Sequence, residues 1–445
     1  MTIPVGWLSI DYKSAIEKIS TNKIKIKQSE YLNQGNFPII DQGQNYIGGY
    51  TNNKEKIIYC DFPVIVFGDH TKVVKLINFS FAPGADGVKV VKPLSFFNPK
   101  IFFYFTKYLV KKIPDKGYSR HFQYIEKEKI PLPPLNEQNR IVEKIEELFS
   151  DLDKATEDLK KTQEQLKIYR QAVLKAAFEG KLTEEWRKKN MLLMLPDNLK
   201  KKIGVGVSEL NYSYIKNIPQ KWILSKINRI CSVVRGGSPR PMGDPKYFDG
   251  NIPFIKIGDI TKLSSKYVLN SKTKVNEQGT KKSRLLPKGS LILSNSGTIC
   301  IPKFLGVDAC IHDGFVSFKD LPEYINVNFL FEFFEYIRPY VIQKNKQGVT
   351  QVNLNIEIVG DIDLLIPTKE EQEQIVQEIE SRLSVCDKLE ETVHQSLEKI
   401  EYLRQSILKK AFEGKLVSQD PNDLPACELL KQIKIEKDKM SKNEK

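Results

Sequence analysis

A stretch of fifty residues occurs twice in this chain, at residues 133–182 and again at residues 367–416. The two copies align without a gap at a constant offset of 234 positions, and 22 of the 50 positions are identical. A shared stretch of this length indicates an internal duplication. The period is too long for a solenoid, so we expect two whole modules, each a globular part followed by the repeated stretch.

The repeated stretch has the spacing of a long helix. In the first copy, apolar or small residues alternate steps of four and three from Ile141 to Ala176, and only Thr162 is polar in this seam. This spacing predicts a heptad seam, which the second copy keeps less regularly from Ile375 to Ile407. About 42 residues at ~1.5 Å each would make a rod of about 60 Å. Because both copies belong to one chain, we expect the two helices to pack against each other; a homodimeric coiled coil is the alternative.

The duplication predicts the domain organisation. Gly180 and Gly414 follow the repeated Phe-Glu pair and suit the left-handed position after a helix end. We therefore expect an α+β chain with these segments: a first globular domain at 1–135, a first long helix at 136–182, a connector at 183–215, a second globular domain at 216–368, a second long helix at 369–416 and a tail at 417–445.

Short apolar runs between turn residues predict strands in the same order in both globular domains. They lie at residues 37–40, 63–67, 73–76 and 87–91, and again at 252–257, 289–293 and 314–318. An aromatic-rich helix follows in each domain, one starting with Asn98 as its cap and the other between Val327 and Val341. The two domains are thus expected to share one architecture.

The net charge of +14 is unevenly distributed over the 445 residues. Residues 1–136 and residues 203–369 each carry +8, whereas the two predicted helices are slightly acidic. Positive potential confined to the two globular domains favours binding to a polyanion. The six cysteines form no CxxC pair and no charged-then-apolar leader opens the chain, so we expect a cytoplasmic protein without a disulfide framework, zinc site or membrane span.

The sequence lacks the motifs of common reaction centres. It has no GxxxxGK[ST] motif, and Gly204 and Gly206 lack the strand and helix context of a dinucleotide loop. Cys300, Cys310 and His70 are most simply core or surface residues. We therefore expect a binding subunit with no catalytic residue, no bound metal and no cofactor of its own.

Loops that carry amides, hydroxyls and basic side chains are the candidate nucleic-acid contacts, because these groups address base edges and phosphates. In the first domain they are Gln42, Gln44, Asn45, Tyr46, His70, Lys72, Tyr118, Ser119, Arg120 and His121. In the second domain they are Arg235, Ser238, Arg240, Lys256, Ser294, Asn295, Ser296, Thr298, Lys344, Lys346, Thr350, Gln351 and Asn353.

The whole chain resembles the specificity subunits of type I restriction-modification systems. The resemblance is carried by LNEQNRIV from Leu135 and KEEQEQIV from Lys369, by the two helix ends with AFEGKL, by IPFIKIGDI from Ile252, by GSLILSNSGTI from Gly289 and by the tail from Ser418. It implies two target recognition domains, each reading half of a split DNA site. It also implies two long antiparallel helices that act as spacer and docking surface, in a pseudo-symmetric circular arrangement.

The resemblance assigns the chemistry to other chains. Two modification subunits would use S-adenosylmethionine to methylate adenine N6, and ATP- and Mg-dependent restriction subunits would complete the complex with double-stranded DNA. Two rival hypotheses are a coiled-coil adaptor without sequence-specific DNA binding, and a nuclease or methyltransferase whose carboxylates are not grouped in the sequence. DNA binding with partner subunits, and turnover by the isolated chain, would separate the three.

Overall fold

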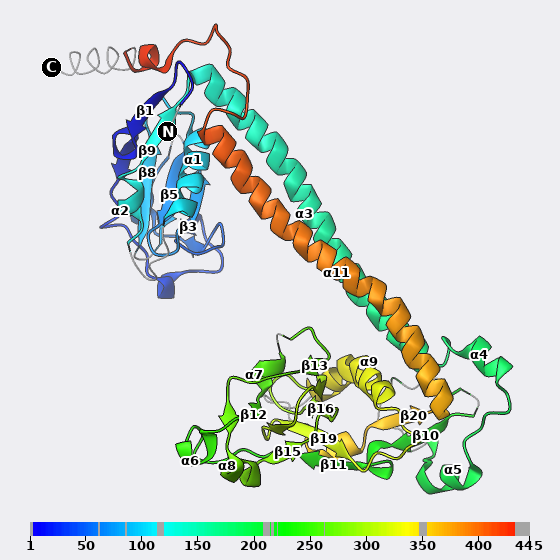
Figure 1. Ribbon diagram of the computed structural model, residues 1–445. Coiled ribbons are helices and arrows are strands. Elements are labelled where there is room, and N and C mark those ends of the chain that lie inside the picture. The colour runs from blue at the N-terminus through cyan, green and yellow to red at the C-terminus, as the bar shows by residue number, and fades with distance from the viewer. Residues whose placement is uncertain are drawn as a thin grey trace. The chain divides into compact units, whose positions relative to one another are not determined.

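The structure is a computed structural model that describes residues 3–60, 63–84, 87–113, 120–207, 214, 218–219, 221–261, 263–346 and 354–431. The chain forms two compact units (Figure 1). Unit 1 comprises Met1–Lys161 and Val393–Lys445, and unit 2 comprises Thr162–Thr392. Each unit therefore contains one globular part, here called the first head (residues 3–132) and the second head (residues 218–366), together with portions of both long helices.

The first head is built on two small sheets. The central sheet has the order β2 (Ile16–Ile19), β8 (Val88–Pro93), β5 (Val64–Gly68), β6 (Val74–Ile77), all antiparallel. The second sheet has the order β4 (Gly49–Thr51), β3 (Phe37–Ile40), β7 (Ala82–Pro83), with β3 and β7 parallel. A separate ribbon pairs β1 (Leu8–Asp11) with β9 (Lys129–Leu132), and the helices are α1 (Pro99–Lys112) and α2 (Phe122–Ile125).

The second head repeats this topology with one extra strand in each sheet. Its central sheet has the order β11 (Ser232–Arg235), β19 (Phe315–Lys319), β16 (Leu291–Ser294), β17 (Pro302–Leu305), β13 (Tyr267–Val268). Its other sheet has the order β14 (Lys274–Val275), β12 (Ile252–Ile255), β18 (Ala309–Ile311), β15 (Arg284–Leu286), and β12 is again parallel to β18. The ribbon pairs β10 (Ile223–Lys226) with β20 (Asp363–Ile366), and the helices are α6 (Pro245–Phe248), α7 (Ile257–Ile260), α8 (Glu277–Lys282), α9 (Val327–Lys346) and α10 (Ile356–Gly360).

The likeness of the two heads extends to single hydrogen bonds. The indole of Trp7 donates to Glu137 Oε2 at 2.7 Å, and the indole of Trp222 donates to Glu371 Oε2 at 3.0 Å. One residue further on, Gln138 Nε2 donates to the carbonyl of Pro133, and Gln372 Nε2 donates to that of Pro367, both at 3.0 Å. The expected common architecture of the two globular domains is confirmed.

Each head buries one face of its aromatic helix against the central sheet. The side chain of Asn98 accepts from the backbone N–H of Lys100 and so caps α1, as its position before Pro99 predicts. Phe102 and Phe105 on α1 are fully buried, as are Phe329 and Phe334 on α9. Burying such a ring contributes roughly 2–3 kcal/mol, so the two apolar runs form core helices.

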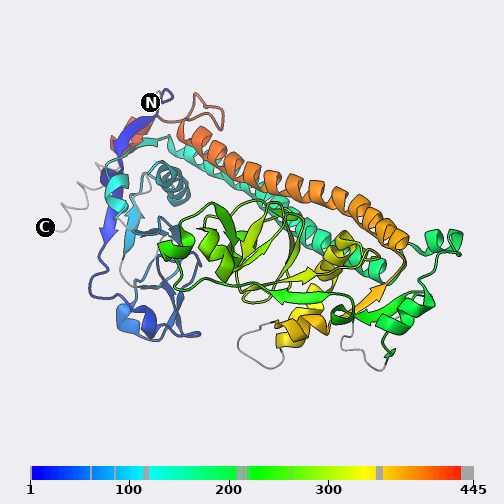
Figure 2. The same cartoon turned by 60° about the horizontal axis from the view of Figure 1, so that its bottom comes forward.

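The two repeated stretches form α3 (Leu135–Phe178) and α11 (Lys369–Phe412), each of 44 residues. Both ribbon views show them side by side and antiparallel (Figures 1 and 2). In unit 2, Arg170 Nη2 lies 2.6 Å from Asp387 Oδ1, and in unit 1, Arg404 Nη2 lies 2.6 Å from Asp153 Oδ1. These residues are equivalent under the 234-residue offset, so the same ion pair occurs once in each unit. Pairing of the two helices within one chain is therefore confirmed.

Each long helix ends on the head of the other repeat. Phe178, at the end of α3, stacks at 5.2 Å on Tyr336 of the second head, and Phe412, at the end of α11, lies 4.8 Å from Tyr108 of the first head. Gly180 and Gly414 have φ of +72° and +68°, as predicted for the residue after a helix end.

The segment after α11 stays on the first head. The backbone N–H of Ala426 donates to the carbonyl of Gly6 at 2.9 Å, and Arg140 on α3 forms an ion pair with Asp423 at 2.6 Å. The corresponding segment after α3 contains α4 (Glu184–Lys189) and α5 (Asp197–Ile203) and packs within unit 2. Among the described residues, every helix falls short of the apolar length that a membrane crossing requires.

Candidate nucleic-acid interface

Four chain segments meet at one end of the central sheet of the first head. The loop after β3 is joined to the turn after β5, because Thr71 Oγ1 donates to the carbonyl of Gln42 at 2.6 Å and the N–H of His70 donates to Gln42 Oε1 at 3.3 Å. Gly87, just before β8, lies so close that a Cβ would be 2.7 Å from both Gln42 Oε1 and His70 Cδ2. The N–H of His121 donates to the carbonyl of Asp69 at 2.9 Å.

Within this cluster, the side chains of Gln44 and Asn45 are exposed at the tip of the β3–β4 loop. Tyr46 is also exposed but is tied down, since its hydroxyl donates to the carbonyl of Leu76. Gln42 and Lys72 are partly buried, and Lys72 adopts a φ of +60° in the tight turn after β5. The loop therefore presents two amide side chains to solvent on a fixed backbone.

Arg120 and His121 differ in their surroundings although they are neighbours. Arg120 is exposed, whereas His121 is buried with its Nδ1 at 2.8 Å from the carbonyl of Asp69. Asp69 Oδ1 in turn accepts from the N–H of Phe122 at 2.8 Å. His121 therefore holds the segment against the β5–β6 turn, and Arg120 is the group that faces solvent. Tyr118 and Ser119, also predicted as contacts, lie outside the described residues.

The second head gathers basic side chains around one acidic residue at the same end of its central sheet. Arg235, at the end of β11, donates from Nε to the carbonyl of Asp313 at 2.7 Å, and Arg240 Nη2 lies 3.6 Å from Asp313 Oδ2. Ser238 Oγ accepts from the N–H of Asp313 at 3.3 Å. Gly236 packs directly against the carbonyl of His312, where a side chain would not fit. Both arginines remain exposed at the surface.

Sequence reasoning missed His312 and Asp313, which organise this cluster. Burial lowers the pKa of His312, Asp313 opposes that shift, and Arg240, Lys256 and Arg235 add to it. The positive charges of three predicted contact residues thus disfavour the protonated form of His312. A signal was present in the sequence, because His312 and Asp313 stand at the turn just before the strand predicted at 314–318.

The loop after β16 is folded by its own polar side chains. Ser294 is buried; its hydroxyl donates to the carbonyl of Thr298 at 2.6 Å and accepts from the N–H of Ile301 at 2.9 Å. Asn295 is buried as well, and its backbone N–H donates to the carbonyl of Gly314 at 2.8 Å. Ser296 is partly buried and Thr298 is exposed. Ser294 and Asn295 therefore shape the loop, and Thr298 reaches solvent.

The remaining predicted contacts are placed apart or not described. Lys256 is partly buried and is the N-cap residue of α7, and Lys344 is exposed near the end of α9. The side chain of Lys346, and residues Thr350, Gln351 and Asn353, lie outside the described part of the chain.

Three cysteines of the second head, Cys231, Cys300 and Cys310, are buried in its packing. Burial raises the pKa of the thiols of Cys300 and Cys310, and it raises the pKa of Cys231 to about 12, with a smaller contribution from Asp320. Such thiols stay protonated at neutral pH. In the described ranges, no three His, Cys, Asp or Glu side chains are grouped as a metal site.

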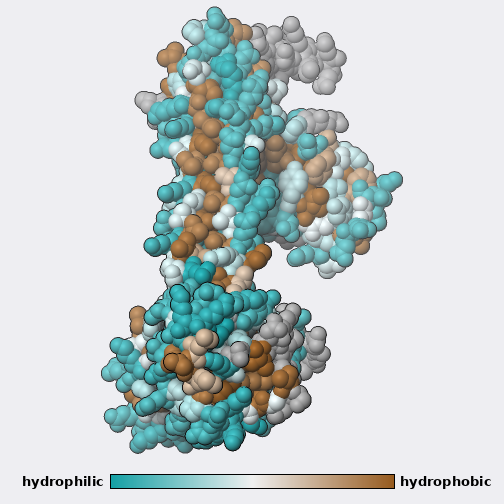
Figure 3. All heavy atoms as spheres, turned by 90° about the vertical axis from the view of Figure 1, so that its right-hand side faces the viewer, coloured by the Kyte–Doolittle hydropathy of each residue, from teal (hydrophilic) through white to brown (hydrophobic). Residues whose placement is uncertain are grey.

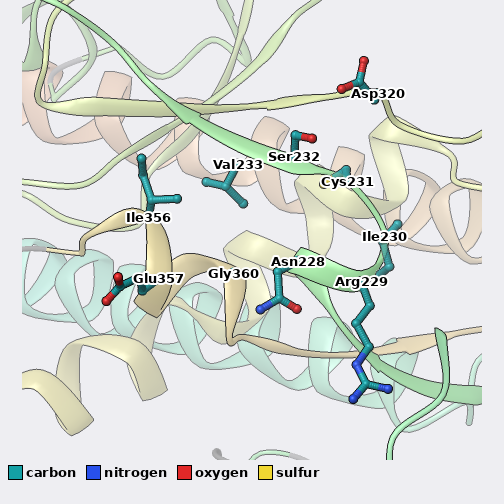
Figure 4. Close-up of a pocket in the computed structure, with 10 residues that line it drawn as sticks. All are labelled: Asn228, Arg229, Ile230, Cys231, Ser232, Val233, Asp320, Ile356, Glu357 and Gly360. Carbon is teal, nitrogen blue, oxygen red and sulfur yellow. The ribbon is translucent and has the colours of Figure 1, made fainter.

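A hollow of about 500 Å³ opens at the opposite end of β11 from Arg235 (Figure 4). It is lined by Ser232 and Val233 of β11, by Arg229 before that strand and by Glu357 of α10. Arg229 donates from Nη1 to the carbonyl of Gly204 at 2.8 Å, so its head group is engaged in packing the connector. The hollow is therefore separate from the loop cluster.

These features define a class of protein: a tandem recognition protein, in which two copies of one α+β head present basic and amide side chains on loops and share a pair of antiparallel helices. The family model for the type I restriction modification DNA specificity domain matches residues 4–167 and 219–399. The chain belongs to this family, and the predicted resemblance and fold class are confirmed.

Named relatives agree with this assignment. The chain is 29% identical over 326 residues to the EcoBI specificity subunit of Escherichia coli, a match that spans 69% of this chain and 64% of that protein. It is 24% identical over 452 residues to the EcoDI specificity subunit of Escherichia coli, covering 98% of this chain and 96% of that one. A solved structure from a study of complex assembly in a type I R-M system shares the fold, with a TM-score of 0.65 at 17% identity, covering 94% of this chain and 100% of that chain. None of these comparisons supports the coiled-coil adaptor.

Proposed function

We propose that this chain is the DNA-reading subunit of a type I restriction-modification complex, and that each head reads one short word of a bipartite site in double-stranded DNA. One observation carries the proposal: the same end of the same sheet bears a cluster of polar and basic loops in both heads. Family membership supports it, and so does the +8 charge of each globular domain.

The exposed side chains of the two clusters suit different parts of the duplex. Arginine pairs with two acceptors of guanine, and an amide pairs with adenine, each such pair contributing about 1–3 kcal/mol of discrimination. In the first head, Gln44, Asn45 and Arg120 are the readers we propose. In the second head they are Arg235 and Arg240, whose guanidinium groups are oriented by contacts with Asp313.

The chemistry belongs, in this proposal, to other chains. Modification subunits would supply S-adenosylmethionine-dependent methylation, restriction subunits would supply ATP- and Mg-dependent cleavage, and the chain would itself be non-catalytic. All of them would meet DNA in the cytoplasm. The match of residues 4–167 and 219–399 to a DNA specificity domain supports that division.

The long helices carry a surface that suits two copies of one partner. Ile168 and Tyr169 on α3 are exposed, and so are Tyr402 and Leu403 on α11, at positions equivalent under the 234-residue offset. Figure 3 shows apolar residues running along the helices on one face. Exposed apolar side chains at equivalent places mark interaction sites, and we propose that each pair docks one modification subunit.

The double substitution Ile168→Ser and Tyr169→Ser should remove one of the two docked modification subunits, because it deletes the apolar contact on one helix only. The mass of the complex, measured by light scattering, should fall from two modification subunits per chain to one. Lys167→Ser, at an exposed position beside the pair, is the matched control and should keep both. A complex that retains both subunits after the double substitution would contradict the docking site.

The reading function is tested by selecting bound sequences from a random duplex pool with the full complex. Two short words separated by a fixed gap are expected. Arg240→Ala should weaken binding to the preferred duplex about tenfold, since an arginine–guanine pair is lost, while leaving random duplex nearly unchanged. Lys288 is an exposed lysine just before the first residue of β16, at the end of the sheet away from the loop cluster. Lys288→Ala should therefore change binding to neither duplex. Equal weakening on both duplexes by Arg240→Ala would remove this arginine from the readers, and selection of no motif would refute the proposed function.

A further inference from the structure

Each head contains a buried lysine that holds the backbone of one loop. In the first head it is Lys75 on β6, whose side chain is only 4% exposed. Its Nζ donates to the carbonyl of Asp41 at 2.9 Å and to that of Asn45 at 2.6 Å. One ammonium group therefore joins both ends of the segment that carries Gln44 and Asn45.

The equivalent strand of the second head repeats this arrangement. Lys303 on β17 is 6% exposed. Its Nζ donates to the carbonyl of Leu263 at 2.9 Å and to that of Ser265 at 2.6 Å, between α7 and β13. The exposed Ser264 lies between the two acceptors. The two loops differ in length and sequence, yet the same kind of clamp closes both.

A buried ammonium is a costly way to stabilise a loop. Burial lowers the pKa of both Lys75 and Lys303, while Asp41 in one head and Glu335 in the other offset part of that cost. An apolar side chain of similar length would avoid the desolvation penalty, but it would leave two carbonyls without a donor. What the lysine adds over an apolar residue is a defined loop conformation, and recurrence in both heads shows that the feature is systematic.

We infer that Lys75 and Lys303 are positioning residues for sequence specificity: Lys75 fixes the loop that follows β3, and Lys303 fixes the segment between α7 and β13, each in the shape that meets DNA. This inference rests on the proposed function. In the first head, the clamp presents Gln44 and Asn45, and the Tyr46 hydroxyl fastens the tip of the same loop to β6. In the second head, it presents the segment around Ser264, which sequence reasoning did not nominate.

The duplicated architecture supplies the experiment with an internal reference. Lys75→Met and Lys303→Met are made in the full chain, assembled with its modification subunits, and bound sequences are selected from a random duplex pool. Lys75→Met should relax base preference about tenfold in one word only, and Lys303→Met should relax the other word only. Lys92→Met and Lys319→Met, on β8 and β19 of the same sheets, should leave both words unchanged.

A purely structural role would give a different result. The thermal midpoint of the variant chain would fall while both words kept their base preferences, and that outcome would overturn the inference. Relaxation of both words by a single substitution would overturn it as well. If Lys75→Met prevents the first head from folding, Lys75→Gln, which keeps a donor of shorter reach, is measured instead, and unchanged preferences would again overturn it. Lys75→Arg, which retains donors, should preserve the word better than methionine. If the wild-type complex selects no two-part motif, the proposed function itself is refuted. Failure of the proposed function is thereby distinguished from failure of the inference about the two lysines.

Discussion

At the scale of single residues, the two heads place one buried glutamate under one tryptophan but surround it differently. Glu371 accepts from Trp222 and, at 2.8 Å, from the hydroxyl of Thr183, and it also forms an ion pair with Arg187. Glu137 accepts from Trp7 and, at 3.2 Å, from Gln419 Nε2. Burial raises the pKa of Glu137, an effect that these two hydrogen bonds oppose. Glu371 therefore compensates the charge of an arginine, whereas Glu137 accepts hydrogen bonds from two neutral donors.

Glu371→Ala should destabilise unit 2 by about 3–5 kcal/mol, because it leaves the partly buried Arg187 without its counter-charge. Glu137→Ala should destabilise unit 1 by only about 1–3 kcal/mol, since it leaves neutral donors unpaired. Thermal or urea unfolding of the purified chain measures both. Glu373→Ala, an exposed neighbour on α11, is the control, and equal losses from the first two substitutions would contradict the argument.

At the scale of elements, the long helices are anchored chiefly at their ends. Phe412 and Ala411 belong to the core of the first head, and Phe178 and Ala177 belong to that of the second. Between the ends, the seam is buried at some positions, such as Leu166, Val393 and Ile400, and only partly buried at others, such as Leu152. The Arg–Asp ion pairs, whose aspartates are exposed, contribute about 1 kcal/mol each or less, so they help to select the register, while the aromatic ends and the buried seam residues supply most of the stability.

Phe412→Ala should cost about 3–5 kcal/mol, as expected for a buried aromatic side chain, and should detach the last turns of α11 from the first head. Amide hydrogen exchange should accelerate near residues 404–412 and on α1, which Phe412 contacts through Phe105 and Tyr108. Tyr402→Ala, at a position that is 76% exposed, should leave exchange unchanged. Faster exchange confined to the second head would contradict the assignment.

At the scale of the whole molecule, we propose that the length of the paired helices sets the gap between the two DNA words of the proposed site. Removing one heptad from each helix, at residues 158–164 and at the equivalent residues 392–398, preserves the seam and both Arg–Asp ion pairs. Seven residues at ~1.5 Å shorten each rod by about 10 Å, or about three base pairs at ~3.4 Å. The selected words should stay the same while the gap shortens.

Selection from a random duplex pool measures this change in the gap. Deletion from α3 alone serves as a control, because it mismatches the antiparallel register and should abolish selection of any two-part motif. An unchanged gap with both deletions would show that the helices do not act as the spacer.

Much of the fold could be predicted from the sequence because the duplication repeats every strong local signal. The heptad seam, the glycines after the helix ends and the strand runs near Phe37 and Ile252 all describe regular structure that burial then confirms. Strands β1 and β2 were missed, since neither is a continuous apolar run between turn residues.

The candidate site was harder to predict because burial within loops leaves no periodic signal. His121, Ser294 and Asn295 resemble surface contacts in sequence but are buried, where their hydrogen bonds shape the loops. Lys75 and Lys303 lie on strands and were not singled out, although they hold the loop backbones. Which polar residue faces inward depends on contacts between segments far apart in the chain.

The placement of Phe412 in the core of the first head has a consequence for how the protein is made. Chains emerge from the ribosome amino end first, and domains generally fold as they appear. The second head receives Phe178 before its own strands are synthesised, so it can close as soon as it is complete. The first head must wait, unfinished, until Phe412 has emerged, so of the two heads the one that is synthesised first is the last to acquire its full core.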